Sequence, residues 1–291
     1  MKKALALNAV FSSVSGIVLV GLNKSIAEFF GVANSNVFWI IGAALLFFLL
    51  NIVLEIKRQN PVGILWIVTQ DLLWVFGSIV ILILQPFDLT SEGNYAIATV
   101  ALVVLGMGIN QARHLSKLDE LPGENVKQLE FKRTVNASKH AAWQVVSDVA
   151  NYHQVAPNID DVKIVSGERK GMIRQCSHGR NAWTETCSMW NEGEAFSFIV
   201  NTNASDYPYP LSYLSGTWQV ESIGEDRTVV RMIYRFAYRR KIMNVFLHPL
   251  MKNGFDKVVD ELLNNWQKQI EAKGKSPGHN EGIVTKDISK F

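Results

Sequence analysis

Three ionisable side chains occupy alternate positions of a predicted β-hairpin in the second half of the chain. Arg174 and His178 lie in the run 172–178, and Glu185 lies in the run 183–190. Side chains alternate between the two faces of a strand, and the face opposite these three is rich in Ser, Thr and Gln, which suits solvent. The three residues should therefore point inward, where a charge must be paired or must bind a ligand.

Three interpretations of this inward face stay open. Arg174, His178 and Glu185 orient the polar end of an amphipathic ligand, or they form a local ion pair, or Glu185 or His178 acts as a general acid or base on a lipophilic substrate. The turn at 179–181 predicts the following facing pairs: His178 with Trp183, Cys176 with Glu185, and Arg174 with Cys187.

A second candidate for chemistry is Asp71, the one charged residue in the long apolar run 59–85. It lies about 15 Å along a helix that starts near residue 61, close to the midplane of a bilayer. Such a carboxyl group marks a proton site, a polar cavity for a lipid headgroup or quinone, or hydrogen bonds between helices. Other polar residues fall toward one end of the apolar runs: Asn8, Asn51, Glu55, Asn110 and Gln111.

Four long runs in the first 116 residues, uncharged except for Asp71, must position these polar groups. Each is close to the roughly 20 residues that a helix needs to cross a bilayer. We therefore predict a four-helix transmembrane domain over residues 1–116. The basic start could be read as a signal peptide, but the first run is long and no clear cleavage site follows it, so we expect it to remain as a span. The runs are Ala4–Asn23, Phe29–Leu54, Gln59–Gln85 and Gly93–Ala112.

The turns between the runs alternate in charge. Lys57 and Arg58 follow the second run, and basic residues also precede the first run and follow the fourth. The opposite turns carry Lys24 with Glu28, and then Asp88 and Glu92. Short cationic loops stay in the cytoplasm, so we expect a multi-pass protein of the plasma (inner) membrane with both termini and the soluble half inside, in contact with membrane lipid.

The composition excludes several classes of site. The net charge is only +3 and no basic stripe stands out, which argues against nucleic acid. The two cysteines, Cys176 and Cys187, lack metal-site spacing and are too few for a disulfide framework, so we expect reduced core thiols, no metal and no cofactor.

The soluble half reads as a linker over 117–125, a domain over 126–272 and a disordered polar tail over 273–291. One strand, a helical pair, six strands and a long amphipathic helix follow one another, which is an α+β order with a curved antiparallel sheet around the last helix. The predicted strands are 126–137, 162–166, 172–178, 183–190, 195–201, 213–222 and 228–239. The predicted helices are 140–150, a second short helix or turn at 152–157, and 243–272.

Several motifs in this half resemble a known superfamily. These are Ala-x-x-x-Trp-x-x-x-x-Asp-x-x-x-Tyr within ASKHAAWQVVSDVANYHQV, the strand AWTETCSMW and the closing FLHPLMKNGFDKVVDELLNNW. Over about 126–272 the chain resembles the START-like (SRPBCC, Bet v 1-type, polyketide cyclase/lipid transport) superfamily. The resemblance implies a helix-grip fold with a hydrophobic cavity for lipids, sterols, quinones or polyketides; a minority of members are enzymes. The first half resembles small bacterial integral membrane proteins only generally.

Strand alternation and the apolar stripe of the last helix select the side chains that would line such a cavity, although an ordinary core would use the same ones. The predicted ligand-binding residues are Arg174, His178, Trp183, Glu185, Phe196, Phe198, Leu214, Trp218, Met232, Tyr234, Phe236, Met251, Phe255, Val258 and Leu262.

The leading hypothesis is a membrane-anchored binding module that holds a hydrophobic small molecule without catalysing a reaction. The alternatives are an enzyme of the cyclase, dehydratase or hydrolase type, and a protein that docks an unidentified partner through a domain with a filled core. Arg239-Arg240-Lys241, followed by Met243, Val245 and Phe246, either presses on anionic lipid or is a solvated run of charge.

Overall fold

The computed structural model describes residues 1–122 and 125–275. The chain forms two compact units. The first unit comprises Met1–Asn125 and Tyr238–Asp256, and the second comprises Val126–Ala237 and the chain from Lys257 on. The segment 238–256 therefore groups with the predicted membrane domain, although it follows the sheet in sequence. Of the tail predicted to be disordered, 276–291 lies outside the described residues, and Lys273–Lys275 end the last helix.

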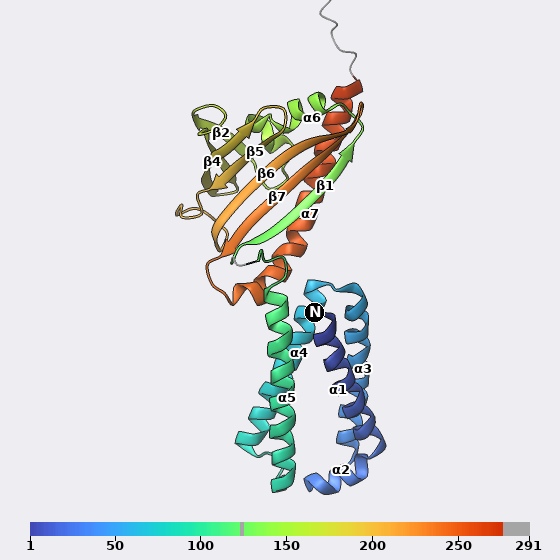
Figure 1. Ribbon diagram of the computed structural model, residues 1–291. Coiled ribbons are helices and arrows are strands. Elements are labelled where there is room, and N and C mark those ends of the chain that lie inside the picture. Colours follow the sequence, from blue (N-terminus) through green and yellow to red (C-terminus); the bar gives the residue numbers. More distant parts are fainter. Residues whose placement is uncertain (123–124, 276–291) are drawn as a thin grey trace, which may run out of the picture. The chain divides into compact units, whose positions relative to one another are not determined.

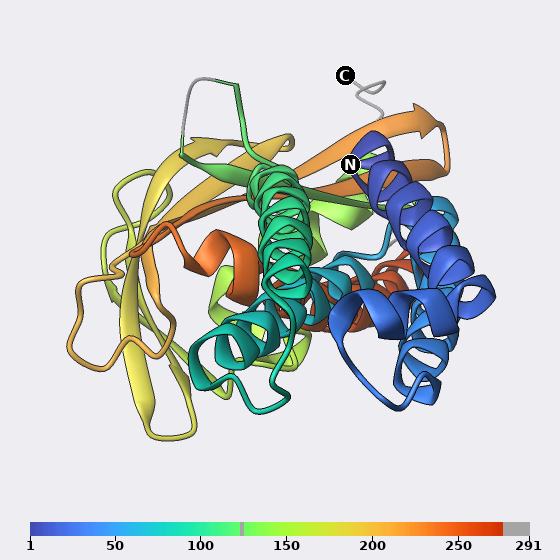
Figure 2. The same cartoon turned by 90° about the horizontal axis from the view of Figure 1, so that it is seen from below.

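Four long helices of the first unit have the length and composition to cross a membrane, as the apolar runs predict. Within the unit α1 packs mainly against α3, and α4 against α5; Figure 2 looks along these helices. The helices of the first unit before the sheet are α1 (Lys2–Gly21), α2 (Asn23–Phe30), α3 (Asn36–Arg58), α4 (Pro61–Leu84) and α5 (Ser91–Ser116).

The short helix α2 is the one element of this region that the apolar runs do not predict. The second run starts at Phe29, but Phe29 and Phe30 close α2, and Gly31 ends it with a left-handed φ of 70°. A left-handed residue is a common helix end, and glycine adopts it without strain. The third helix consequently begins at Asn36, seven residues later than the run.

Small residues allow α1 and α3 to approach closely. A Cβ atom added to Gly42 would lie 2.8 Å from the backbone oxygen of Gly16, and one added to Gly16 would lie 3.1 Å from the oxygen of Gly42. Glycines at a crossing let two helix backbones meet where lipid offers no hydrophobic drive to association. This pair therefore sets the α1–α3 contact.

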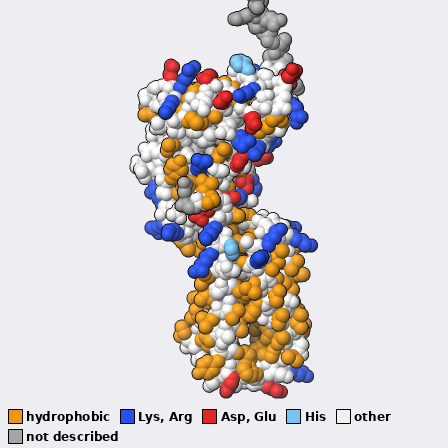
Figure 3. Space-filling view, in the orientation of Figure 1, with side chains coloured by type: hydrophobic (Ala, Val, Ile, Leu, Met, Phe, Trp, Pro, Cys, Tyr) orange, Lys and Arg blue, Asp and Glu red, His pale blue; other side chains and the backbone are white. Residues whose placement is uncertain are grey.

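The surface of the first unit agrees with a lipid environment. Apolar side chains cover the flanks of its helices, and Lys and Arg gather at one end (Figure 3). The basic end carries Lys57 and Arg58 of α3 and Arg113 of α5, whereas the N-terminal turn of α5 carries Glu92. A lipid-facing band between polar ends is typical of a transmembrane bundle.

The second unit is built on a seven-stranded antiparallel sheet with the order β1-β7-β6-β5-β4-β3-β2. The first strand pairs with the last, and α6, η1 and the later part of α7 complete the unit; Figure 1 shows the sheet curving past α7. The α+β helix-grip class is thus confirmed. The elements are β1 (Lys127–Val135), α6 (Lys139–Val146), η1 (Val149–Gln154), β2 (Asp161–Ser166), β3 (Ile173–His178), β4 (Asn181–Asn191), β5 (Ala195–Val200), β6 (Leu211–Gly224), β7 (Arg227–Tyr238) and α7 (Met243–Lys275).

The predicted register of the β3–β4 hairpin is wrong by two residues. Arg174 faces Glu185, Cys176 faces Trp183 and His178 faces Asn181. The turn consists of Gly179 and Arg180 alone, because His178 pairs directly with Asn181. Gly179 has a left-handed φ of 59°, and two-residue turns with such a residue match the twist of the strands. A slip of two residues preserves the alternation, so Arg174, Cys176, Trp183 and Glu185 are buried as predicted. His178, at the end of β3, is exposed and does not point into the core as predicted.

Candidate ligand-binding site

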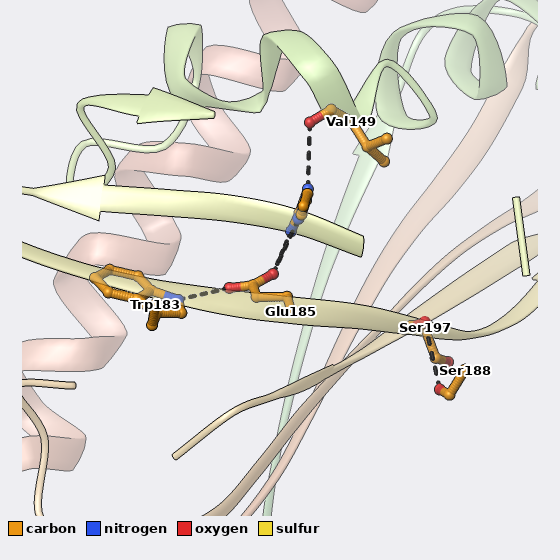
Figure 4. Close-up of polar contacts among 6 residues, drawn as sticks. Val149, Trp183, Glu185, Ser188 and Ser197 are labelled. Atoms are coloured by element: carbon orange, nitrogen blue, oxygen red, sulfur yellow. Dashed lines mark hydrogen bonds and ion pairs between the residues drawn. The ribbon is translucent and has the colours of Figure 1, made fainter. Parts of the chain in front are cut away.

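A buried ion pair joins β3 and β4 on the inner face of the sheet. Arg174 donates from Nε and Nη2 to Oε2 of Glu185, at 3.0 and 2.7 Å, and from Nη1 to the carbonyl oxygen of Val149 at 3.3 Å. Trp183 donates from its indole nitrogen to Oε1 of Glu185 at 2.9 Å, as Figure 4 shows. Protein donors therefore occupy both carboxylate oxygens.

The guanidinium of Arg174 stays charged although only 1 % of the residue is exposed. Burial opposes the charge, but the neighbouring carboxylate of Glu185 outweighs it and raises the pKa of Arg174. The guanidinium also lies 4.0 Å from the ring centroid of Phe198 and 5.0 Å from that of Tyr152, where each ring face attracts a cation. The ion pair thus holds two aromatic rings as well as two strands.

The titratable groups around the pair are kept neutral. Burial, reinforced by the charge of Glu185, raises the pKa of the Cys176 thiol. Burial also raises the pKa of Tyr152 and of Tyr234, whose hydroxyl groups hydrogen-bond to each other. A protonated thiol is a poor nucleophile, so Cys176 serves as a small apolar core residue.

Trp218 on β6 lies at the centre of an aromatic cluster. Its ring stacks on Phe196 with centroids 5.2 Å apart and meets the edges of Tyr152 and Tyr234 at 5.9 and 6.0 Å. The residue is 4 % exposed, and its indole nitrogen has no hydrogen-bond partner among the described residues. A buried donor without an acceptor is costly and rare in native proteins.

The structure brings together most of the predicted ligand-binding residues within the second unit. Leu214, Tyr234 and Val258 are half-buried, and Met251 and Phe255 group with the first unit. The residues buried in the second unit are Arg174, Trp183, Glu185, Phe196, Phe198, Trp218, Met232, Phe236 and Leu262.

His178 lies apart from the ion pair, at the exposed end of β3. Its Nδ1 is 3.3 Å from Oδ1 of Asp160, and the backbone N–H of Gly179 donates to the other oxygen of the same carboxylate at 2.7 Å. These two contacts lower the pKa of Asp160. The structure therefore does not bring His178 and Glu185 together as an acid–base pair.

A polar network in the first unit links three of the long helices. Asn8 of α1 and Gln111 of α5 both donate to Oδ2 of Asp71 on α4, at 2.7 and 3.3 Å, and Ser12 donates to the Asn8 side chain at 3.1 Å. Glu55 lies outside this network and accepts the backbone N–H of Asn60 at 3.1 Å. Hydrogen bonds of this kind hold membrane helices in register.

Sequence reasoning does not find two further polar clusters. Trp143 and Trp190 both donate indole N–H groups to Glu192, at 2.8 and 2.9 Å. Only the spacing of Trp190 and Glu192 is visible in the sequence, because Trp143 lies on α6, far along the chain. These contacts fix the β4–β5 turn against α6.

The second cluster lies in the first unit, after α5. Asp119 accepts from Lys252 and lies 3.6 Å from Nε2 of His248, whose Nδ1 is 3.1 Å from the Tyr238 hydroxyl. Partial burial opposes ionisation of Asp119, but His248 and Lys252 outweigh it and lower the pKa of this carboxyl group. More than a hundred residues separate Asp119 from its partners, so no local pattern signals the contact.

No group of three or more His, Cys, Asp or Glu side chains in the described part of the chain is arranged to hold a metal ion. The inner face of the sheet instead carries a buried aromatic cluster, one buried charge pair and the indole N–H of Trp218, which has no hydrogen-bond partner among the described residues. Such a lining suits a largely apolar molecule with a single polar group.

Comparison with known proteins assigns this part of the chain. Residues 127–271 match the family model described as polyketide cyclase / dehydrase and lipid transport. A search of curated proteins gave no significant match.

Similar solved structures cover the same half of the chain. The Zhui aromatase/cyclase from Streptomyces sp. R1128 has 15% identity over 51% of this chain and 98% of its own, with a TM-score of 0.41. Norcoclaurine synthase from Thalictrum flavum, in complex with dopamine and hydroxybenzaldehyde, has 15% identity over 56% of this chain and 94% of its own, with a TM-score of 0.43. Ara h 8.0201 has 10% identity over 50% of this chain and 99% of its own, with a TM-score of 0.40.

Proposed function

Residues 127–271 form a domain of the polyketide cyclase / dehydrase and lipid transport family, and from that premise we propose that the chain is a membrane-anchored binding module. The domain holds a hydrophobic or amphipathic small molecule of lipid or quinone type against the aromatic inner face of its sheet. Four helices anchor it to the plasma membrane on the cytoplasmic side, so that the domain meets ligand dissolved in the bilayer at high local concentration.

The observation that carries this proposal is the unsatisfied indole nitrogen of Trp218. It lies among Phe196, Tyr152 and Tyr234, where an apolar ligand would find ring faces to pack on. A carbonyl or ether oxygen on the ligand would accept the Trp218 N–H and remove the cost of leaving it unpaired. The ligand class is therefore an apolar molecule with at least one hydrogen-bond acceptor.

The ion pair has a supporting part in this scheme. Both oxygens of Glu185 already accept hydrogen bonds from Arg174 and Trp183. A ligand would have to displace a protein donor to reach this carboxylate, whereas the Trp218 N–H has no hydrogen-bond partner to give up among the described residues. Arg174 and Glu185 thus position the rings, and Trp218 contacts the ligand.

The experiment is mass spectrometry of molecules that co-purify with the full chain in mild detergent, compared with the variant Trp218→Phe. This change removes the N–H and keeps a ring. We expect an apolar compound on the wild-type protein and about three- to tenfold less on the variant, which corresponds to one net hydrogen bond.

A matched control is Trp190→Phe. Trp190 also stacks on Phe196, with centroids 5.3 Å apart, but its indole nitrogen is already satisfied by Glu192. Retention of ligand on this variant would exclude a general loss of aromatic packing. Wild-type protein that carries no apolar compound, or equal loading of the wild type and Trp218→Phe, would contradict the proposal.

A further inference from the structure

The start of α7 exposes a row of large apolar side chains. Ile242 precedes the helix, and Phe246 and Leu250 follow at intervals of four residues; their exposed fractions are 59, 40 and 53%. Residues four apart on a helix lie on one face. Single exposed apolar residues are ordinary, but three in a row on one face of a short segment mark an interaction surface.

The neighbouring face of the same segment is fixed to the end of the helical bundle. Val245 packs on an apolar cluster that includes Leu5 of α1, Ile52 of α3 and Leu115 of α5. These three residues lie near the helix ends that carry the basic side chains. The segment is therefore held at the level where the apolar flanks of the bundle give way to its charged end.

Polar contacts hold the same face from the other direction. Fully buried His248 and half-buried Lys252 both approach the carboxylate of Asp119, just beyond α5. Since Val245, His248 and Lys252 share this held face, the helix cannot rotate to bury Ile242, Phe246 and Leu250 without breaking these contacts. The contacts of Val245, His248 and Lys252 therefore keep Ile242, Phe246 and Leu250 exposed.

Charge complements the row on its N-terminal side. Arg240 and Lys241 are exposed and directly precede Ile242. A stripe of large apolar residues beside cations is typical of segments that lie in the headgroup region of a membrane, where the apolar groups enter the acyl boundary and the cations meet anionic lipid.

We infer that Ile242, Phe246 and Leu250 insert into the interface of the same bilayer that the four long helices cross, with Arg240 and Lys241 at anionic headgroups. This inference rests on the proposed membrane anchoring. A lipid surface is favoured over a protein partner because the row is continuous with a segment already seated on the bundle's charged end. The start of α7 thereby becomes a third point of attachment to lipid, beside the spans and their basic turns.

The test places a nitroxide spin label on the full chain in nanodiscs and compares collision with oxygen, which concentrates in lipid, and with a water-soluble nickel chelate. The labelled variants are Phe246→Cys and Leu250→Cys. Leu102→Cys, exposed on α5, is the reference for lipid, and Lys268→Cys, exposed late on α7, is the reference for water. The native thiols Cys176 and Cys187 are buried, and the unsubstituted chain gives their background.

We expect the labels at Phe246→Cys and Leu250→Cys to favour oxygen, as at Leu102→Cys, and to move deeper when phosphatidylglycerol is added to phosphatidylcholine. The double variant Arg240→Gln/Lys241→Gln should abolish that dependence on anionic lipid. Water-like labels at both positions, with a lipid-like label at Leu102→Cys, would overturn the inference and leave the anchoring intact.

Two other outcomes also decide the question. A water-like label at Leu102→Cys would overturn the membrane anchoring itself, and the inference with it. Labels at Phe246→Cys and Leu250→Cys that are shielded from both reagents would show that protein covers the row, which overturns the lipid assignment. Unchanged thermal unfolding of each variant confirms that the labels report on the native fold.

Discussion

Arg174 and Glu185 show how one pair of side chains can fix the geometry of a largely aromatic core. The carboxylate receives three hydrogen bonds from two partners, and the guanidinium lies against two ring faces. A buried ion pair of this kind adds little net stability, because removing both charges from water costs about as much as their attraction returns. Its value lies in the single arrangement of Trp183, Phe198 and Tyr152 that it permits.

At this scale we predict that Arg174→Met destabilises the second unit by about 3–5 kcal/mol, because Glu185 is left buried without its counter-ion. The double variant Arg174→Met/Glu185→Leu should recover most of that loss. Urea unfolding of the full chain in nanodiscs, followed by tryptophan fluorescence, measures both.

The control is Arg231→Met. Arg231 pairs with Glu130 and Glu221 at the surface of the sheet, so its removal should cost less than about 1 kcal/mol. If Arg174→Met costs no more than this control, the buried pair does not have the role assigned to it.

At the scale of elements, hydrophobic patterning predicts the long helices and the strands, whose apolar residues recur at a regular spacing. It misses short helices such as α2. The alternation Met232, Tyr234, Phe236 identifies both β7 and its inner face. The helix α2 is missed because its apolar end, Phe29 and Phe30, merges with the next apolar run. Short helices carry too few residues for a reliable period.

The candidate site follows the same division. The inward face that carries Arg174 and Glu185 is predictable, because alternation alone assigns it. Their direct pairing is not, since it depends on the length of the turn at Gly179. The exposure of His178, the lone indole donor of Trp218 and the contact of Asp119 with Lys252 depend on packing between segments far apart in sequence.

Two glycines allow a sharp prediction for the helix contact in the first unit. Gly42→Ala places a methyl group 2.8 Å from the Gly16 oxygen and should destabilise the bundle by about 1–3 kcal/mol through overpacking. Gly77→Ala meets nothing within 4 Å and should stabilise α4 by up to about 1 kcal/mol, because alanine favours helix. Unfolding of the full chain in mixed SDS micelles, followed by circular dichroism, measures both.

Opposite signs for these two variants would support the close α1–α3 crossing. Equal stabilisation by both alanines would show that the two backbones do not approach as the structure has them.

At the scale of the whole molecule, the distribution of charge predicts the orientation of the proposed spans. Single cysteines at Glu28→Cys and Lys57→Cys should differ in their reaction with a membrane-impermeant maleimide added to intact cells. We expect reaction at Glu28→Cys and none at Lys57→Cys until the membrane is permeabilised, because basic loops remain inside. The reverse pattern would place the sheet on the outer side of the membrane.

The path of the backbone makes the two units harder to separate than a linear order suggests. The chain passes from one unit to the other after Asn125, returns after Ala237 and crosses again after Asp256. After a protease cut ahead of Val126, the sheet would still be joined covalently to the segment 238–256. That segment packs on the first unit, so the two fragments would stay together. A shortened protein that starts at Val126 would still carry Val245 and His248 but would lack the cluster and the carboxylate that cover them. Deleting the first 125 residues would thus expose the apolar side of the segment 238–256, and we expect the shortened protein to aggregate instead of behaving as a water-soluble carrier.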